Sequence, residues 1–490
     1  MPSPSLMAEA APAAAPPAAG PAATPALQLE RVAQRFGKSW VLRGCSLAVA
    51  PGEAVALLGS NGAGKTTLLR IAATLLSPTR GGGRVLGRDL RREAAAVREE
   101  VGLLGSSAAL YEDLTAAENL RFACRMRGAP ADEARIAHVL EEVGLAGRAD
   151  VRVREFSSGM RRRVGLARLL LHPPRLLLLD EPYASFDADG IERVNALVAR
   201  VKEAGGAVLI ATHDLPRAVP VVERVLRLED GVLLDVPHEP APASRQTAAA
   251  FPPLSSVGRP EGARRPSELR RAAAVAWKDL TAERRTRANL NAVLFFAGLM
   301  LLLFGFALGP DAAALRAAGA GIVWLTVLYS GVLVFQRSYQ LELEGGGLEV
   351  LLLSPGDRRS IFLGKLAANL ALVLLVEAVV LPLSAALFHL PLGESFLGIV
   401  GILLLGTLGF VTLGTFYAAL ASRVRAREVL LPLLLFPMLV PLLVGAVEAT
   451  DALLSRNAMG DAGSWARLLA AFDLIFLVAS TLAFEYVIED

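Results

Sequence analysis

A glycine-rich stretch that ends in lysine and threonine, GSNGAGKTT, has the GxxxxGK[ST] spacing that binds nucleotide phosphates. Its residues are Gly59, Ser60, Asn61, Gly62, Ala63, Gly64, Lys65, Thr66 and Thr67. The glycines let backbone N–H groups close on phosphate oxygens, and the start of a following helix favours an anion. We expect Lys65 to neutralise the β- and γ-phosphates of ATP and Thr66 to bind Mg²⁺. The apolar run AVALL before the loop and the helical run LLRIAATLL after it argue against an incidental glycine turn.

Two later segments add acidic and imidazole groups. The run RLLLLDEP predicts a buried strand that delivers Asp180 to its end as a second Mg²⁺ ligand, with Glu181 next to it to polarise the attacking water. The segment ATHD places His213 after another apolar run, within reach of a γ-phosphate. Alone, the acids would be an ordinary acidic turn and His213 an ordinary strand-end histidine. Because both segments follow the phosphate-binding loop, we interpret Glu181 and His213 as catalytic.

The elements that position these residues lie between residues 27 and 236. Short β-like runs alternate there with helical stretches, which predicts an α/β domain with a mainly parallel sheet. The segment TAAE, Thr115 to Glu118, has the spacing of a capping box and predicts a helix start. Residues 1–26 are rich in Ala and Pro and lack the pattern of a secretory signal, so we expect a disordered cytoplasmic tail. Residues 237–267 have the composition of a linker.

The remainder, residues 268–490, is strongly apolar. The whole chain is 53% hydrophobic with a mean hydropathy of +0.47, which is too apolar for a wholly soluble protein. Six runs near the length needed to cross a bilayer predict an all-α transmembrane domain of six helices. Basic residues gather before the first run, after the second and after the fourth, so both ends of this domain are expected in the cytoplasm with the α/β domain. Six spans in the chain argue against a nucleic-acid partner, and its two cysteines are too far apart to suggest a metal site or disulfide framework.

Taken in order, the phosphate loop, the serine-glycine segment FSSGM, the DEP segment, Asp187 in YASFD and His213 resemble the nucleotide-binding domain of ABC transporters. The resemblance implies an α/β P-loop fold and a head-to-tail dimer, in which ATP is clamped between the phosphate loop of one copy and FSSGM of a second copy. Ser157 and Gly159 keep the family pattern LSGGQ, whereas Phe156, Ser158 and Met160 differ. Ser157 can still cap a helix whose free N–H groups would face the γ-phosphate.

The resemblance gives roles to two further positions. Phe36 in QRFG stands where the family has an aromatic residue on the adenine, although a packed core phenylalanine is nearly as compatible with the sequence. Ser107 stands where the family has a glutamine that reaches magnesium or water and senses the permease. Serine is too short for that reach, so either a water fills the gap or ATP is coupled to the membrane domain through a weaker contact. The adjacent Arg161, Arg162 and Arg163 point in different directions on a helix and do not form a nucleic-acid stripe.

The membrane half resembles CcmB, the permease of cytochrome c maturation, through EGGGLEVLLLSPGDRRSIFLGK and the segment from Arg425 to Thr450, and the ATPase half resembles CcmA. This implies a natural CcmA–CcmB fusion in the bacterial inner membrane that drives haem delivery and release of a haem-loaded periplasmic chaperone. Family partners would be CcmC-, CcmD- and CcmE-like proteins. The alternative is an ABC-2-type exporter of lipid, polysaccharide or drug.

Polar residues in the membrane half leave several interpretations open. His389 is expected to be an interfacial histidine rather than a haem ligand. Glu377 and Asp473 are either functional groups or partners of polar groups between helices. Pro432, Pro437 and Pro441 are expected to interrupt the hydrogen bonding of the fifth span. An acidic and basic set in the cytoplasmic segment either docks the ATPase or forms a solvated face. That set is Glu342, Glu344, Glu349, Arg358 and Arg359.

Overall fold

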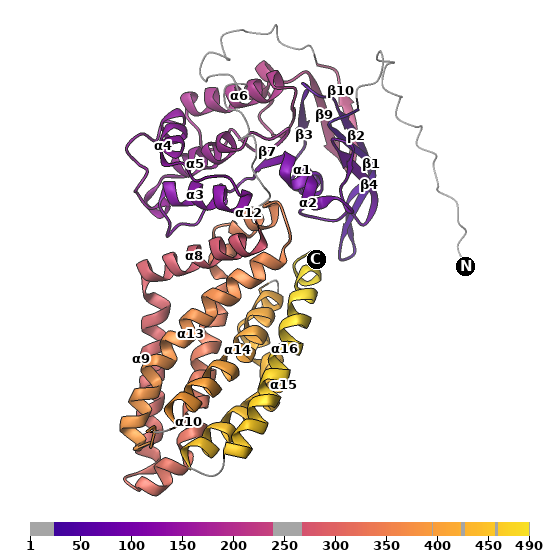
Figure 1. The fold of residues 1–490 in the computed structure, drawn as a ribbon. Coiled ribbons are helices and arrows are strands. Elements are labelled where there is room, and N and C mark those ends of the chain that lie inside the picture. The colour runs from indigo at the N-terminus through magenta and orange to yellow at the C-terminus, as the bar shows by residue number, and fades with distance from the viewer. Residues whose placement is uncertain (1–23, 239–266, 394, 423–426, 456–458, 490) are drawn as a thin grey trace, which may run out of the picture.

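The computed structural model describes residues 24–238, 267–393, 395–422, 427–455 and 459–489. The predicted tail and linker lie almost wholly outside this part of the chain, as do Arg425 and the side chain of Glu344. The structure has an α/β part at one end and a bundle of long helices at the other, with further helices packed between them (Figure 1). The α/β part followed by six apolar helices confirms the predicted order of an α/β domain and an all-α domain.

A six-stranded sheet forms the centre of the α/β part, in the order β10-β9-β3-β8-β7-β6. Its strands are β3 (Ala54–Leu58), β6 (Val101–Leu104), β7 (Leu176–Asp180), β8 (Ala207–Ala211), β9 (Arg224–Glu229) and β10 (Val232–Val236). All neighbours pair in parallel except β10, which is antiparallel to β9 at the edge. Every residue of β6, β7 and β8 is buried, which explains their continuous apolar runs. The carboxyl ends of these parallel strands share one edge, where the predicted site residues follow them.

A second, four-stranded antiparallel sheet was not predicted. Its order is β2-β1-β4-β5, built from β1 (Leu27–Phe36), β2 (Ser39–Val49), β4 (Arg80–Val85) and β5 (Arg88–Asp89). The pairing of β1 with β2 is irregular at three points. Such irregularities shift which residues face the core, so the two strands lack the clean alternation that would reveal them in the sequence.

Helices cover the sheet; α3 lies on the side of the α/β part that faces the bundle, and α6 lies on the opposite side (Figure 1). They are α1 (Lys65–Ala72), α2 (Ala94–Glu100), α3 (Ala116–Arg127), α4 (Glu133–Glu142), α5 (Ser158–Leu171), α6 (Ala188–Glu203) and α7 (Leu215–Ala218). The predicted capping box is confirmed, because the Thr115 hydroxyl accepts from the Glu118 N–H and the Glu118 carboxylate accepts from the Thr115 N–H.

Six helices of the bundle are long and apolar enough to cross a membrane, as predicted. They are α9 (Ala288–Leu308), α10 (Ala312–Ser338), α13 (Arg359–Phe388), α14 (Phe396–Ala421), α15 (Arg427–Leu454) and α16 (Met459–Glu489). The start of α9 and the end of α16 lie on the side of the α/β part (Figure 1). Pro432, Pro437 and Pro441 lie inside α15, which nevertheless runs as one continuous helix.

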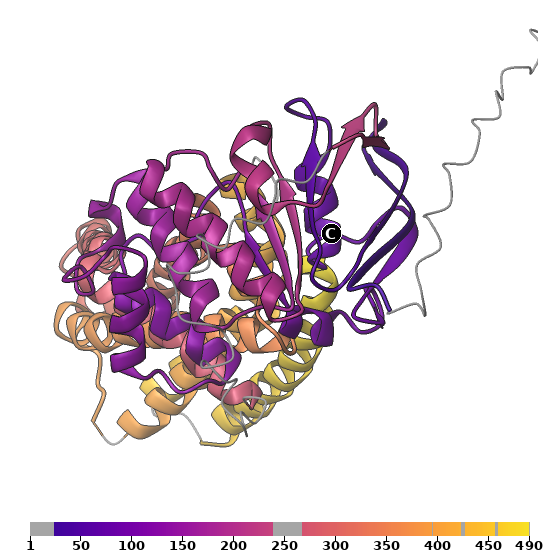
Figure 2. The ribbon, with the colours of Figure 1, turned by 90° about the horizontal axis from the view of Figure 1, so that it is seen from above.

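Three further helices lie between the bundle and the α/β part. They are the long α8 (Glu268–Thr286) and the short α11 (Gln340–Glu344) and α12 (Gly347–Leu353). The helix α8 packs along α13 on one side and α3 on the other. Seen from above, the α/β part lies over the end of the bundle (Figure 2). These helices therefore form the contact between the two halves of the chain.

Candidate active site

The phosphate-binding loop connects β3 to α1 and depends on its glycines. Gly62 and Gly64 have positive φ angles of 85° and 108°, which side chains rarely adopt. A Cβ at Gly64 would also lie 2.9 Å from Val41 Cγ1, and one at Gly59 would lie 2.8 Å from the Leu228 carbonyl oxygen. The loop therefore combines unusual backbone angles with close packing, as a backbone that encloses phosphates requires.

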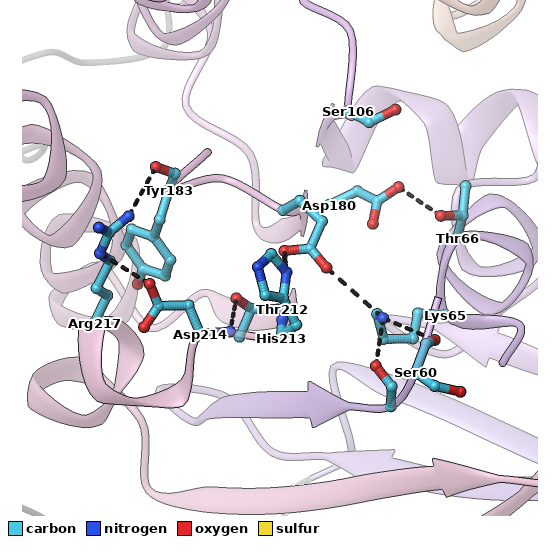
Figure 3. A network of polar contacts seen from close by, with 12 residues as sticks. Ser60, Lys65, Thr66, Ser106, Asp180, Tyr183, Thr212, His213, Asp214 and Arg217 are labelled. Carbon is cyan, nitrogen blue, oxygen red and sulfur yellow. Dashed lines mark hydrogen bonds and ion pairs between the residues drawn. The ribbon is translucent and has the colours of Figure 1, made fainter. Parts of the chain in front are cut away.

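Lys65 is the first residue of α1 and is buried. Its ammonium group donates to the carbonyl oxygens of Gly59 at 2.7 Å and Ser60 at 3.2 Å (Figure 3). It also lies 3.7 Å from the Glu181 Oε1 atom. The lysine that is predicted to neutralise phosphates thus sits inside the loop, next to the predicted catalytic carboxylate.

Thr66 and Asp180 are joined by a hydrogen bond. The Thr66 hydroxyl donates to Asp180 Oδ2 at 2.7 Å, across the gap between the start of α1 and the end of β7 (Figure 3). Asp180 is only 3% exposed, and this burial raises its pKa. A hydroxyl and a carboxylate suit Mg²⁺, which takes oxygen ligands and completes its shell with phosphate and water oxygens. Within the described ranges, no group of three or more His, Cys, Asp or Glu residues suited to a metal occurs, and the binding of Mg²⁺ by Thr66 and Asp180 stays a prediction.

Glu181 and His213 also meet. His213 Nδ1 lies 2.7 Å from Glu181 Oε2, and the His213 side chain is 68% exposed at the end of β8. Glu181 has a positive φ of 48°, an uncommon conformation for a residue with a side chain. The loop after β8 is fixed by the Asp214 N–H, which donates to the Thr212 hydroxyl, and by the Arg217 guanidinium, which pairs with the Asp214 carboxylate (Figure 3). Lys65, Thr66, Asp180, Glu181 and His213 therefore form one cluster, as the sequence order suggested.

A cavity of about 690 Å³ opens beside this cluster. Its wall includes residues 59–63 of the phosphate loop, His213 and Trp40. Phe36 does not line this cavity and is 50% exposed, so the packed-core alternative for Phe36 is wrong. Its contact with adenine stays a prediction. Trp40 was missed, although an aromatic residue four positions after Phe36 in the same hairpin was the available signal.

Ser157, Gly159 and Asp187 form a second group. Ser157 caps α5 by accepting from the Met160 N–H at 3.3 Å, and Asp187 caps α6 by accepting from the Gly190 N–H at 3.0 Å. The bond from Gly190 holds the pKa of Asp187 below its usual range. Ser157 and Asp187 are exposed. The predicted cap at Ser157 is thus confirmed, and the N–H groups at the start of α5 lie on an exposed surface.

The three adjacent arginines of α5 have three different sets of partners, in agreement with the prediction that they point in different directions. Arg161 pairs with Glu112 at 2.6 Å, and Arg163 pairs with Asp187 at 3.0 Å. Arg162 is buried and donates to two backbone carbonyl oxygens, those of Glu181 at 2.7 Å and Ser106 at 2.6 Å. The two hydrogen bonds of Arg162 were not predicted, because the sequence shows only the direction of this side chain on the helix.

The ATPase contacts the membrane domain through the turn between α11 and α12. Ser107 is exposed, and a Cβ added to Gly346 would lie 2.8 Å from the Ser107 hydroxyl oxygen. Glu349 of α12 pairs with Arg70 in the last turn of α1. A second contact joins α8 to α3, where the Arg285 guanidinium donates two 2.6 Å hydrogen bonds to the Glu118 carboxylate.

Three members of the acidic and basic set between residues 342 and 359 have different surroundings: one docks on the α/β part, one lies on a half-exposed face, and one is buried in a third arrangement that was not predicted. Glu349 docks the ATPase, and Arg359 lies near Glu485 at 3.9 Å on a half-exposed face. Glu342 is fully buried and lies 2.5 Å from Lys278 and 2.7 Å from Lys365. Burial alone would raise the pKa of Glu342, but the two ammonium groups lower it to about 2.

Two acids lie inside the predicted spans. Glu377 of α13 accepts a hydrogen bond from the Thr407 hydroxyl of α14, so it pairs with a polar group between helices. Asp473 of α16 is 5% exposed, packs against Gly409 of α14, and has no hydrogen-bond partner among the described residues. His389 is exposed and ends α13 with a left-handed backbone. That position agrees with the expected interfacial histidine.

Comparisons with known families divide the chain in the same way as the structure. The "ABC transporter" family matches residues 42–184, and the "CcmB protein" family matches residues 270–489. The ATPase half is similar to the cytochrome c biogenesis ATP-binding export protein CcmA of Xanthomonas axonopodis pv. citri (strain 306). The two are 44% identical over 178 residues, which are 36% of this chain and 82% of that protein.

Two further relatives differ in their stated roles. CcmA 2 of Cupriavidus metallidurans (strain ATCC 43123 / DSM 2839 / NBRC 102507 / CH34) is 39% identical over 38% of this chain and 89% of its own length. The linearmycin resistance ATP-binding protein LnrL of Bacillus subtilis (strain 168) is 34% identical over 43% of this chain and 68% of its own length. A solved ATP-binding subunit of an ABC transporter is 29% identical, with a TM-score of 0.39, over 42% of this chain and 87% of that chain.

Proposed function

Because this chain belongs to the ABC transporter family and joins a CcmA-like ATPase to a CcmB-like membrane domain, we propose that it hydrolyses ATP to deliver haem for cytochrome c biogenesis. The observation that carries the proposal is that both resemblances occur in one polypeptide. The chain is a multi-pass membrane protein with six apolar helices. Its proposed location is the bacterial inner membrane, with the ATPase in the cytoplasm.

The proposed hydrolysis uses the cluster at the carboxyl ends of β3, β7 and β8. Lys65 would hold the phosphates, and Thr66 and Asp180 would hold Mg²⁺, which neutralises charge on the phosphate oxygens when bound. Glu181 would accept the proton of the attacking water, and His213 would hold the carboxylate in place and contact the γ-phosphate. The 2.7 Å separations of Thr66 from Asp180 and of Glu181 from His213 support these roles.

A second copy of the chain is proposed to complete each ATP site. Nucleotide-binding domains of this family act as dimers, and Ser157 and Asp187 are exposed on the ATPase surface. In the proposed arrangement, the capped start of α5 with Ser157 and Gly159 faces the γ-phosphate held by the partner copy. Since each chain carries one ATPase and one membrane domain, the simplest assembly with two complete sites is a homodimer.

Haem is proposed to remain with partner proteins that resemble CcmC, CcmD and CcmE. Haem iron requires an axial ligand such as histidine, and the described part of the membrane domain offers His389 at an exposed helix end. This favours a machine that changes conformation and releases a haem-loaded chaperone. The alternative is an ABC-2-type exporter of lipid, polysaccharide or drug, which the similarity of the ATPase half to LnrL favours.

The test compares Glu181→Gln with the control Glu192→Gln, which alters an exposed acid of α6 outside the cluster. ATP turnover is measured on the chain in lipid nanodiscs, and holocytochrome c and haem-loaded chaperone are measured in the producing cells. We expect Glu181→Gln to abolish turnover and chaperone release and Glu192→Gln to leave both unchanged. Normal holocytochrome c with abolished turnover would contradict the proposal. ATPase stimulation by a lipid or drug in nanodiscs, without any haem-handling partner, would favour the exporter.

A further inference from the structure

Arg162 occupies an unusual position in the ATPase. It is 8% exposed, and both of its described hydrogen bonds go to backbone carbonyl oxygens in different segments. Arg162 Nη1 donates to the backbone carbonyl oxygen of Glu181 at 2.7 Å, and Nη2 donates to that of Ser106 at 2.6 Å. A guanidinium is planar and rigid, so it holds two acceptors at a fixed separation. Arg162 therefore couples the backbone positions of Glu181 and Ser106.

The backbone of Glu181 is held from both sides. Its N–H donates to the Ala211 carbonyl at 2.8 Å, and its own carbonyl accepts from Arg162. Between these two bonds the residue has the uncommon φ of 48°. Such a conformation persists only where its surroundings impose it. Since the direction of the side chain follows from the backbone, these bonds set where the Glu181 carboxylate points.

Ser106 belongs to a loop that touches the membrane domain. The next residue, Ser107, lies beside Gly346 at the turn between α11 and α12, since a Cβ on Gly346 would stand 2.8 Å from the Ser107 hydroxyl oxygen. A Cβ at Gly105 would lie 3.5 Å from the Glu349 carboxylate of α12. At the end of the same loop, the Tyr111 hydroxyl lies 3.4 Å from the Gly347 carbonyl oxygen, to which it donates. A shift of this turn therefore moves a loop whose backbone is bonded to Arg162.

We propose that Arg162 is a positioning residue that transmits movement of the α11–α12 turn to the Glu181 carboxylate. The inference rests on the proposed ATP hydrolysis and adds the route by which the membrane domain controls it. The short Ser107 side chain contacts the turn, and Arg162 carries the displacement on to the Glu181 backbone. Neither described hydrogen bond of Arg162 goes to the phosphate loop, so we expect it to affect the chemical step and to leave ATP binding to Lys65.

The experiment measures kcat and KM for ATP in nanodiscs for Arg162→Gln and Arg162→Lys. The matched control is Arg135→Gln, because Arg135 of α4 also donates to a backbone carbonyl, that of Leu171 at 2.9 Å, away from the cluster. We expect Arg162→Gln to lower kcat by about 10- to 100-fold, part of the ~10²–10⁴-fold that a positioned base contributes. KM should stay within about twofold, because ground-state binding is untouched. Arg162→Lys keeps the positive charge and should recover part of the lost kcat. Recovery should be incomplete, because one ammonium group cannot bond both carbonyl oxygens as the planar guanidinium does.

A double-mutant cycle tests the route from the membrane domain. Gly346→Ala would place a methyl group against Ser107 and should change kcat in the parent chain. In the Arg162→Gln chain the same substitution should have no further effect, because the connection is already broken. Thermal unfolding of each variant, measured in the same nanodiscs, separates this outcome from general loss of fold. A purely structural role for Arg162 would lower the unfolding temperature and leave the two substitutions additive.

Three results would overturn the inference. They are a normal kcat in a folded Arg162→Gln chain, an equal loss in Arg135→Gln, and additive effects of Arg162→Gln and Gly346→Ala. Each of these leaves the proposed function standing if Glu181→Gln abolishes turnover. Retained turnover in Glu181→Gln would instead contradict the proposed function itself, so the two failures are distinguishable.

Discussion

Glu342 is the residue at which loss of a single charge should most affect stability. It is 0% exposed and lies within 2.7 Å of the ammonium groups of Lys278 and Lys365, which are 1% and 0% exposed. Glu342→Gln keeps the shape of the side chain and removes its charge. The two lysines would then share Asp279, which lies 2.5 Å and 3.1 Å from them. Because neither ammonium reaches water, the lost charge is not replaced by solvent.

The expected cost follows from this burial. Removing one partner from a buried ion pair costs about 3–5 kcal/mol. Because Asp279 remains, we expect the lower end, about 3 kcal/mol, for Glu342→Gln. At ~2–4 °C per kcal/mol for a unit of this size, the unfolding temperature should fall by about 6–12 °C. The double variant Glu342→Gln, Lys365→Met restores the balance of charge and should lose less than Glu342→Gln alone.

The pH dependence of this effect has a defined sign. Because the pKa of Glu342 in the folded protein is lowered to about 2, its contribution is present above the ordinary glutamate pKa of ~4.3. It is lost only as the pH falls from there through the lowered value. The difference between the parent chain and Glu342→Gln should therefore be constant from pH 8 to about pH 5 and shrink below that.

The assay is thermal unfolding in one detergent at one heating rate, with Glu485→Gln as the control. Glu485 is a partly exposed acid of α16, and its carboxylate forms a half-exposed ion pair with Arg359 at 3.9 Å. Loss of this exposed pair should lower the free energy of unfolding by less than about 1 kcal/mol. An unfolding temperature for Glu342→Gln within about 2 °C of the parent chain, less than 1 kcal/mol by the same conversion, would refute the reasoning. So would an equal loss in Glu485→Gln.

Three other predictions concern the ATPase and its docking. Trp40→Ala should raise KM for ATP at least about fivefold, which is the range expected for loss of base stacking on an aromatic ring. Phe36→Ala should raise KM less. If a steady-state assay gives the reverse order, Phe36 is the adenine contact. Burial raises the pKa of Asp180, so at limiting Mg²⁺ the ATPase activity should begin to fall at a pH above the ordinary aspartate pKa of ~3.9. Excess Mg²⁺ should restore the activity. A series of rate measurements at different pH values checks both. Gly347→Val would force a side chain into the Tyr111 ring, 2.8 Å from the Cβ position, and should cost about 1–3 kcal/mol in thermal unfolding.

The cluster of site residues could be predicted because it depends on short sequence patterns and on one rule of topology. The phosphate loop, Asp180 and His213 each follow an apolar run, and the carboxyl ends of parallel strands meet at one edge. Their 2.7 Å contacts follow from that arrangement. The cap at Ser157 could be predicted for a similar reason, because capping is a local interaction within four residues.

The features that were missed depend on contacts between distant segments. Arg161, Arg162 and Arg163 have identical chemistry, and only the fold decides that the middle one meets the carbonyls of Ser106 and Glu181. Likewise, the buried charge cluster around Glu342 includes Lys278, 64 positions away, so the sequence offered only a docking face or a solvated face for Glu342. The helix α8 was not predicted, because its basic residues were used only to orient the first span.

The two roles of Glu118 have a consequence for how the chain is assembled during synthesis. Its carboxylate caps α3 through Thr115 and also receives Arg285 of α8. In the same region, Tyr111 exchanges two hydrogen bonds with Asn119, which fixes the ring that Lys278 of α8 approaches to 4.3 Å. Domains generally fold in the order in which they leave the ribosome, amino-terminal first. We therefore expect the ATPase part to form its docking surface before α8 has been translated, so that α8 is ordered on a surface that already exists.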